Sequence, residues 1–512
     1  MSKNKNPRLL NRKQSFQYAC GFFGLMLPLS TFNAFSYNFV IYVIGLDEFL
    51  ASIGTFIGLL CFAFGGVIWG YISDNKVPGK LGRRRPFLLY GAPIFAVMFI
   101  LLWLFPVKCT SPNEVNYGVA IYYWIVCAVF STLYMMVWSP YLAMLPEIST
   151  DEENRIQISS DQGMFNMVAT IIGLLLPFIL ISGVEDPKET LFHENIGGQV
   201  LSAQMITLSI IFAIISLTMI YITFFNIKEP IVEECKDENI SESQLRPEEC
   251  EPKKNGLIEL FKATFTPFKN RDFTWWSGAN FTVNYGMRIP MTIMLGILMY
   301  VLDLEGVALI LFIILILPFV GGGFFLWNKL SKKWGLKKTY LTVISLLVIF
   351  MGSGAIFLVD FGEVLKIILG FLVITILVSC LIALYILPNP IVSKIIDLEI
   401  EHIEENEGLE DEDDRYKFSG KYFGANAFML NLAGAISFLL IGMSLRGGGS
   451  KDPFILTILL PVTAIIMIFG VLSASGISLQ KREKTNIVTL IKFLLIVIIP
   501  IILTLVVVKM LI

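Results

Sequence analysis

The amino-acid sequence predicts an all-α polytopic membrane protein with two six-helix halves and one additional C-terminal transmembrane helix. Three observations predict this fold class. Hydrophobic residues make up 55% of the 512 residues and the mean hydropathy is +0.72, so the chain is far more apolar than a soluble domain. Apolar runs long enough to cross a bilayer recur along the chain. Two pieces of sequence also repeat at nearly the same spacing.

The apolar runs divide the chain into parts. Residues 16–226 hold six runs and are expected to form the N-terminal half, and residues 273–480 hold six more and form the C-terminal half. A thirteenth run at 487–511 is almost entirely aliphatic, and we expect a peripheral accessory helix there. The runs lie at 16–44, 49–73, 86–106, 118–146, 159–183, 203–226, 273–302, 306–328, 339–359, 363–396, 419–445, 453–479 and 487–511.

The distribution of Lys and Arg over alternate loops predicts the orientation of the chain. Cationic loops resist translocation, so the basic side is expected to be cytoplasmic. This places the N-terminus, with a tail at 1–15, in the cytoplasm and the C-terminus outside a cell membrane. Residues 227–272 are expected to form a cytoplasmic linker, with a solvated acidic segment followed by a helix on the membrane surface. The loop cations on the outer side are Lys108, Lys188, Lys366, Arg446 and Lys451.

An internal repeat supports the two halves. The heptapeptide GRRRPFL at 82–88 is echoed by GLKKTYL at 335–341, and the seven-residue spacing from Pro140 to Glu147 recurs between Pro390 and Asp397. Both echoes have an offset of about 250 residues, as expected for a parallel duplication. In transporters built this way the substrate site lies between the halves near the middle of the bilayer.

The loop at 70–86, GYISDNKVPGKLGRRRP, is short and strongly basic, and it joins the second and third apolar runs. It resembles the signature loop of the major facilitator superfamily, Gly-x-x-x-Asp followed by Gly-Arg-Arg. The resemblance implies the major facilitator fold and a latch at the cytoplasmic side. The residues expected to form this cytoplasmic gate are Asp74, Arg83, Arg84, Arg85, Glu147 and Asp397.

A second resemblance narrows the family. The segment PYLAMLPEISTDEENRIQISS from Pro140 resembles the junction between helices 4 and 5 in the glycoside-pentoside-hexuronide:cation symporters. The segments at 395–405 and 417–424 look like the corresponding junction after helix 10. The resemblance implies a monomeric transporter that moves a small polar organic solute, a sugar or glycoside, by alternating access. Lysophospholipid symporters resemble the same branch, so an amphiphile carrier stays open as an alternative.

The coupling residues of that branch are not found here. Its cation-binding carboxylates fall on Met26, Phe62, Gly66 and Trp138, and none of these is acidic. A hard cation normally needs at least one carboxylate, so we do not expect a melibiose-type sodium site. Coupling to H⁺ or Na⁺ through another site, and uniport, both stay open. No other cofactor and no metal site is expected, and the seven cysteines contain no C-x-x-C pair.

Polar and aromatic residues inside the spans are the candidates for binding substrate. Amides offer donors and acceptors to hydroxyl-rich ligands, and aromatic rings suit a sugar face. Asn280 and Asn426 also lie within spans, and the alternative for every one of these amides is that it only joins helices. The branch places an arginine at the position of Gln162 and a lysine near Asn431. The expected substrate-binding residues are Asn33, Trp138, Gln162, Asn166, Asn284, Arg288, Tyr385 and Asn431.

Arg288 is the most informative of these residues, because a cation inside a span is costly and faces either a partner or a watery cavity. We expect it in the substrate cavity, and the alternative is a structural pair with a carboxylate such as Asp161. A non-transporting sensor also stays open as a function. The two histidines, His193 and His402, fall in loops, so a membrane enzyme is not expected. The segregation of charge by loop leaves no face for nucleic acid.

Overall fold

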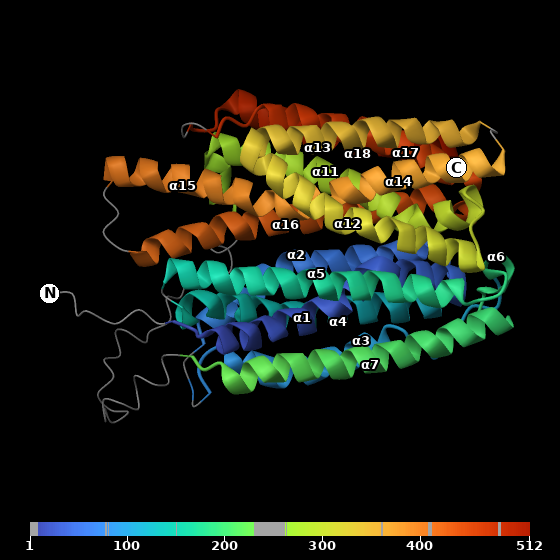
Figure 1. The fold of residues 1–512 in the computed structure, drawn as a ribbon, viewed down its shortest axis with the longest axis horizontal. Coiled ribbons are helices and arrows are strands. Elements are labelled where there is room, and N and C mark those ends of the chain that lie inside the picture. The colour runs from blue at the N-terminus through green and yellow to red at the C-terminus, as the bar shows by residue number, and fades with distance from the viewer. Residues whose placement is uncertain are drawn as a thin grey trace.

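The computed structural model describes residues 9–76, 79, 81–149, 151–229, 262, 264–359, 362–407, 412–479 and 483–511. Long helices run nearly parallel to one another and form two bodies that lie side by side (Figure 1). The N-terminal half contains α1 (Arg12–Asn38) with its π-helical extension η1 (Phe39–Ile44), α2 (Glu48–Asp74), α3 (Arg85–Leu101), α4 (Tyr117–Ile148), α5 (Glu152–Ser182), α6 (Pro187–Thr190) and α7 (Ile196–Asn226).

The C-terminal half has the same kind of organisation. It contains η2 (Thr266–Lys269), α11 (Arg271–Gly296), η3 (Ile297–Val301), α12 (Gly306–Trp334), α13 (Leu336–Gly352), η4 (Ser353–Leu358), α14 (Glu363–Ile386), α15 (Pro388–Glu407), α16 (Glu412–Leu445), η5 (Gly449–Lys451), α17 (Pro453–Ser475) and α18 (Ile487–Leu511). Most of the interhelical packing lies within each half, and α2 against α16 is the main contact between them.

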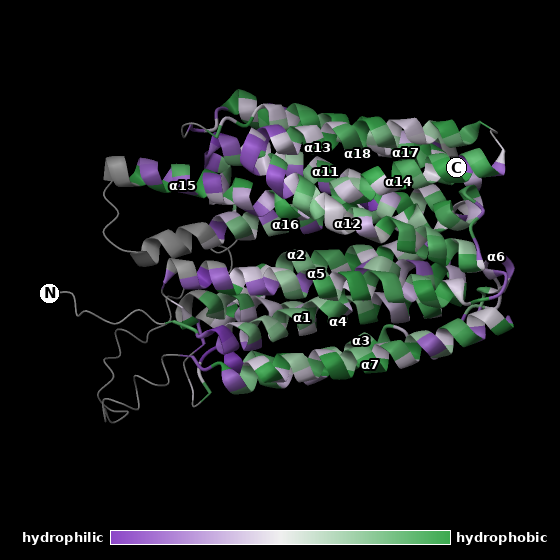
Figure 2. Ribbon diagram, viewed as in Figure 1, coloured by the Kyte–Doolittle hydropathy of each residue, from purple (hydrophilic) through white to green (hydrophobic). Residues whose placement is uncertain are grey.

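Among the described residues, eleven helices are long and apolar enough to cross a membrane. Two further helices complete the thirteen that the sequence predicts. The apolar helix α3 is shorter, at 17 residues, and α11 carries the polar residues that the substrate site was expected to use. Apolar residues cover the middle of the bundle and polar residues gather towards its ends (Figure 2). The chain is therefore a multi-pass membrane protein.

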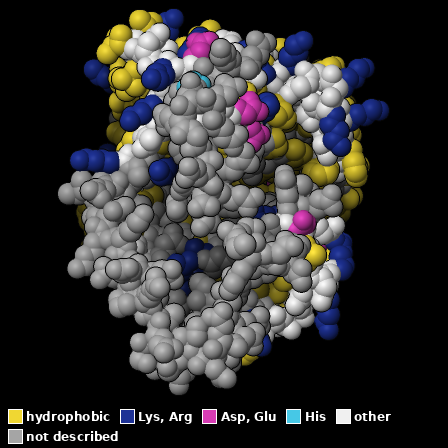
Figure 3. Space-filling model, turned by 90° about the vertical axis from the view of Figure 1, so that its left-hand side faces the viewer, with side chains coloured by type: hydrophobic (Ala, Val, Ile, Leu, Met, Phe, Trp, Pro, Cys, Tyr) yellow, Lys and Arg dark blue, Asp and Glu magenta, His cyan; other side chains and the backbone are white. Residues whose placement is uncertain are grey.

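The basic end is where α2 ends at Asp74 and α3 begins at Arg85. The far end is where η1 leads into α2, at 39–48. Figure 3 looks onto the basic end, where Lys and Arg side chains lie mainly along the margins of the face.

The thirteenth helix, α18, is not free of polar contacts. It packs against α11, α17 and α16, and the Tyr285 hydroxyl of α11 donates to Thr504 Oγ1 at 2.8 Å. The segment just before α18 is joined to the start of α11 by the backbone bridge between Lys484 and Asn270. The helix therefore belongs mechanically to the C-terminal half. The surface helix expected before α11 lies mostly outside the described residues.

Candidate functional site

The site is built around Arg288, which α11 places where the two halves meet. A Cβ atom added to Gly434 of α16 would lie 3.2 Å from Arg288 Nε and 3.4 Å from Leu59 Cδ1 of α2. Residue 434 has to be small because the guanidinium lies against the backbone of α16. Tyr385 of α14 is within electrostatic range of the same guanidinium.

No hydrogen bond or ion pair joins the Arg288 side chain to another described residue; its backbone carbonyl accepts from Thr292. The alternative pairing with Asp161 is wrong. Asp161 is buried at the basic end, where it accepts from Ser15 Oγ at 2.5 Å and pairs with Arg12 at 3.1 Å. The donors of the half-buried Arg288 guanidinium are therefore open to water or to a ligand.

An amide ladder supports the same region of α11. Asn280 Nδ2 and Trp276 Nε1 both donate to Asn426 Oδ1 of α16 at 2.9 Å, and Asn284 Nδ2 donates to Asn280 Oδ1 at 2.7 Å. Asn280 and Asn426 are buried and join the two helices, as the alternative reading of the amides expected. Asn284 is the half-exposed last member, one turn before Arg288.

An aromatic cluster forms the corresponding part of the N-terminal half. The Trp138 ring of α4 stacks on Tyr134 with centroids 5.5 Å apart and meets Phe22 of α1 edge-on at 5.0 Å. Gln162 is buried and donates to the Tyr141 hydroxyl at 3.0 Å. Tyr141 lies on α4, one helical turn after Trp138. The structure thus brings Trp138 and Gln162 together, with Gln162 positioning an aromatic ring.

The other predicted substrate residues are more dispersed. Asn33 is exposed on α1, and Tyr385 is 65% exposed on α14. Asn166 accepts from Thr170 of its own helix at 3.3 Å, and Asn431 donates to the Ala427 carbonyl of its own helix at 3.0 Å. Among the described residues, no hydrogen bond or ring contact links these four residues to Arg288, although Tyr385 lies within electrostatic range of it.

The basic end is held by a residue that sequence reasoning missed. Glu229, just after α7, is fully buried, and its carboxylate accepts the backbone N–H groups of Arg83, Arg84 and Arg85 at 2.6, 2.7 and 2.7 Å. The expectation that Glu229 lies in a solvated segment is wrong. A carboxylate at this position is favoured because three N–H groups at the start of α3 point at it. The sequence feature that could have identified Glu229 is its position, as an acidic residue directly after the sixth apolar run.

The arginine side chains of the predicted gate also lie within the N-terminal half. Arg84 donates to the carbonyl of Ala143 on α4, while Arg85 donates to the Phe224 carbonyl at 2.7 Å and lies over its ring. Asp397 is exposed on α15. The side chains of the other two predicted gate residues, Asp74 and Glu147, lie outside the described residues.

At the far end the two halves are joined directly. The Tyr42 hydroxyl of η1 donates to the Ser450 carbonyl at 2.8 Å, and Lys188 forms an ion pair with Glu305 at 2.9 Å and another with Asp303. Gly442 of α16 lies so close to α2 that a side chain there would overlap Ser52. The far end is therefore closed in this structure.

A family model for MFS/sugar transport proteins matches residues 17–453. The chain belongs to this family. It is therefore a major facilitator transporter and not an enzyme, which confirms the family and fold that the sequence motifs predicted.

Curated relatives resemble this chain over part of their length. It is 27% identical over 194 residues to the uncharacterized symporter sll1374 of Synechocystis sp., covering 38% of this chain and 36% of that protein. It is 24% identical over 170 residues to the sodium-dependent lysophosphatidylcholine symporter 1 of Mus musculus, covering 33% and 32%. The chain thus matches about a third of the length of each curated relative.

Solved structures show the same fold. The inward open xylose transporter XylE of E. coli superposes with a TM-score of 0.56 at 15% identity, covering 94% of this chain and 98% of that chain. At this identity the similarity concerns the fold alone.

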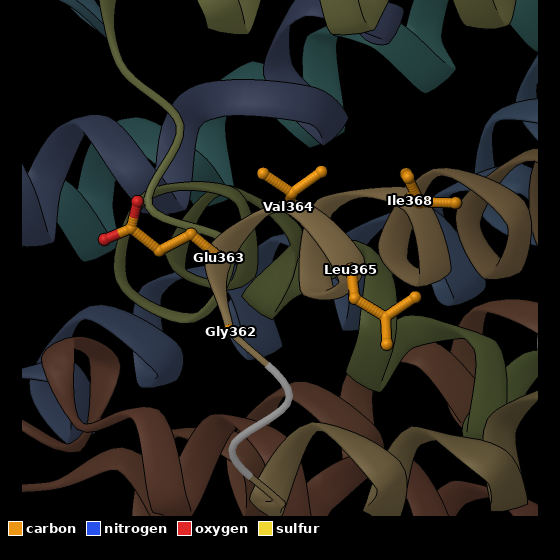
Figure 4. Close-up of a pocket in the computed structure, with 5 residues that line it drawn as sticks. All are labelled: Gly362, Glu363, Val364, Leu365 and Ile368. Atoms are coloured by element: carbon orange, nitrogen blue, oxygen red, sulfur yellow. The ribbon is translucent and has the colours of Figure 1, made fainter.

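The transporter also has a surface pocket of about 380 Å³ at the start of α14, lined by Gly362, Glu363, Val364, Leu365 and Ile368. Val364 and Ile368 point the same way from the helix (Figure 4). This pocket includes none of the predicted substrate residues. Its lining comes from one helix end and is mostly aliphatic, so it lacks the converging polar groups that a polar solute needs.

Proposed function

We propose that this transporter carries a small polar organic solute, a sugar or glycoside, by alternating access between two six-helix halves. The observation that carries the proposal is the Arg288 guanidinium, which lies between the halves without a described partner. Arg288 is half-buried, and a charge that is partly removed from water without a partner is costly. A bound solute that accepts hydrogen bonds would offset that cost.

The surrounding residues fit a hydroxyl-bearing ligand. The guanidinium presents a planar fork of donors that can bind two neighbouring oxygens at once. Asn284, one turn away on α11, adds an amide carbonyl, and the Trp138 cluster adds an aromatic face in the other half. A solute bound between Arg288 and Trp138 would contact both halves, as alternating access requires.

Uptake into proteoliposomes by the purified protein tests the proposal, with a panel of sugars, glycosides, organic anions and lysolipids. For the transported solute, Arg288→Ala should reduce apparent affinity at least about 30-fold, because truncating one partner of a buried charged contact costs about 2–5 kcal/mol. Arg288→Lys should be intermediate, since it keeps the charge and loses the fork.

The matched control is Lys492→Ala, which removes an exposed cation from α18. It should leave uptake unchanged. Normal uptake by correctly inserted Arg288→Ala would contradict the proposed site.

A lysolipid or other amphiphile is the second candidate, favoured by the similarity to lysophosphatidylcholine symporters. The Arg288 fork would then bind a phosphate. Uptake of lysolipid, with no uptake of any sugar or glycoside, would select this candidate.

The proposed orientation places the basic end in the cytoplasm of a cell membrane, with the far end outside, and the protein acts as a monomer. Support comes from the Lys and Arg side chains around the basic end (Figure 3). Labelling of single cysteines at Phe225 and Ile196, exposed at the basic and far ends respectively, would test the orientation in intact cells.

A further inference from the structure

The far end contains a buried carboxylate whose hydrogen-bond donors belong to the opposite half. Glu48, the first residue of α2, has 0% exposure. Its Oε1 accepts from Ser450 Oγ at 2.7 Å, and its Oε2 accepts from the backbone N–H of Gly448 at 3.3 Å. Opening of the far end must break both bonds, since α2 and η5 lie in different halves.

Among the described residues, no other side chain at the far end donates a hydrogen bond to the Glu48 carboxylate. Lys451 is close enough for Glu48 to act on it: burial lowers the pKa of the Lys451 ammonium, and the Glu48 charge opposes that effect. Tyr37 donates to the backbone carbonyl of Glu48 at 3.3 Å. The titratable and charged groups that surround Glu48 and its partners are Asp47, Tyr37, Tyr42, Tyr123, Tyr300, Arg446 and Lys451.

The environment of Glu48 therefore changes with the state of the transporter. With the far end closed, the carboxylate is completely removed from water; with it open, the side chain loses its partners from η5 and becomes hydrated. Burying a carboxylate costs more than burying a neutral carboxyl group. Closure is therefore easier once one proton from the medium has bound to a carboxylate oxygen.

We propose that Glu48 couples proton binding to closure of the far end. The carbonyl oxygen of the protonated group still accepts a hydrogen bond from Ser450 or Gly448. Acidification then favours the closed far end, and proton release accompanies its opening. This inference rests on the alternating access proposed above and supplies a proton-linked group where the sodium-site carboxylates of the related symporters are missing.

Distances between spin labels test the inference without a known substrate. Ile196 and Phe454 are 82% and 56% exposed at the far ends of the two halves, and cysteines there can carry the labels after the seven native cysteines are replaced. The fraction with the short distance should rise as pH falls from 8 to 5. One linked proton changes the open-to-closed ratio by up to about tenfold per pH unit.

Two variants separate Glu48 from its neighbour. Glu48→Gln cannot ionise and should give a closed far end with no dependence on pH. Asp47→Asn is the matched control, because Asp47 is also buried but caps α2 by accepting from the N–H groups of Phe49 and Leu50 within its own half. It should keep the pH response of the parent protein.

A parent-like pH response in Glu48→Gln, or its loss in Asp47→Asn, would overturn the assignment. Ser450→Ala removes the hydroxyl donor and should shift the ratio towards the open form by about two- to tenfold, as expected for a hydrogen bond to the neutral, protonated carboxyl group. A label distance that stays fixed in every variant and at every pH would overturn alternating access itself. Changing distances without a Glu48 effect would overturn this inference alone.

Discussion

Replacement of Glu229 by Gln tests how the basic end is held together. The fully buried carboxylate accepts the N–H groups of Arg83, Arg84 and Arg85 at 2.6–2.7 Å. Hydrogen bonds to a charged group contribute about 1.5–3 kcal/mol each. Gln keeps one acceptor oxygen but turns an NH₂ group towards at least one of the N–H donors. Loss of one or two of the three bonds predicts a destabilisation of about 3 kcal/mol.

Thermal unfolding in detergent, followed by tryptophan fluorescence, measures this effect. A loss of 3 kcal/mol corresponds to a fall in Tm of about 6–12 °C for a unit of roughly 200 residues. Gly82→Ala should act in the same direction, because Gly82 has φ +88° and a Cβ there would lie 2.6 Å from Glu229 Oε2. Glu363→Gln, at an exposed carboxylate on α14, is the control. An unchanged Tm in Glu229→Gln, or an equal fall in the control, would refute the reasoning.

Two further predictions concern the site and a loop at the far end. Gly434→Ala should lower substrate affinity about tenfold while the protein remains folded, because the new Cβ would lie 3.2 Å from Arg288 Nε and displace the guanidinium; parent-like uptake would contradict this. Hydrogen bonds from the hydroxyl and N–H of Thr110 hold the pKa of Glu114 below its usual value. The stability that these bonds contribute is therefore fully present above the usual pKa of a Glu carboxyl, and it is lost as the pH falls through the lowered pKa. Hydrogen exchange at the amides of Thr110 and Ser111 should therefore show protection at pH 6 that Glu114→Ala abolishes, because the variant has no acceptor oxygen, and equal protection in the variant would contradict the assignment.

The helices could be predicted from the sequence because membrane spans carry their signal locally, as long apolar runs. The helix α11 was also predicted, as the run at 273–302, although its polar residues keep it out of the eleven helices that are long and apolar enough to cross a membrane. The repeat between residues 82–88 and 335–341 correctly indicated two halves, and the junction motifs indicated the family. These features depend on neighbours in the sequence and not on tertiary contacts.

The roles of single polar residues could not be read in the same way. Asn280 and Asn284 are the same residue type on one helix, yet Asn280 is buried in a contact between helices and Asn284 is half-exposed. That difference depends on how α11 is rotated against α16. Glu229 and Glu48 were missed because their partners lie about 145 and 400 residues away in sequence, and no local pattern specifies such partners.

Substitution of Gly442 offers a way to hold the transporter in one conformation. Any side chain at this position would act as a wedge between α2 and α16 near Ser52, while both helices keep their packing within their own halves. Variants with bulky residues at 442 would accumulate the conformation with the far end open. They would provide a uniform starting material for structure determination of that state, and for selecting antibodies that recognise it.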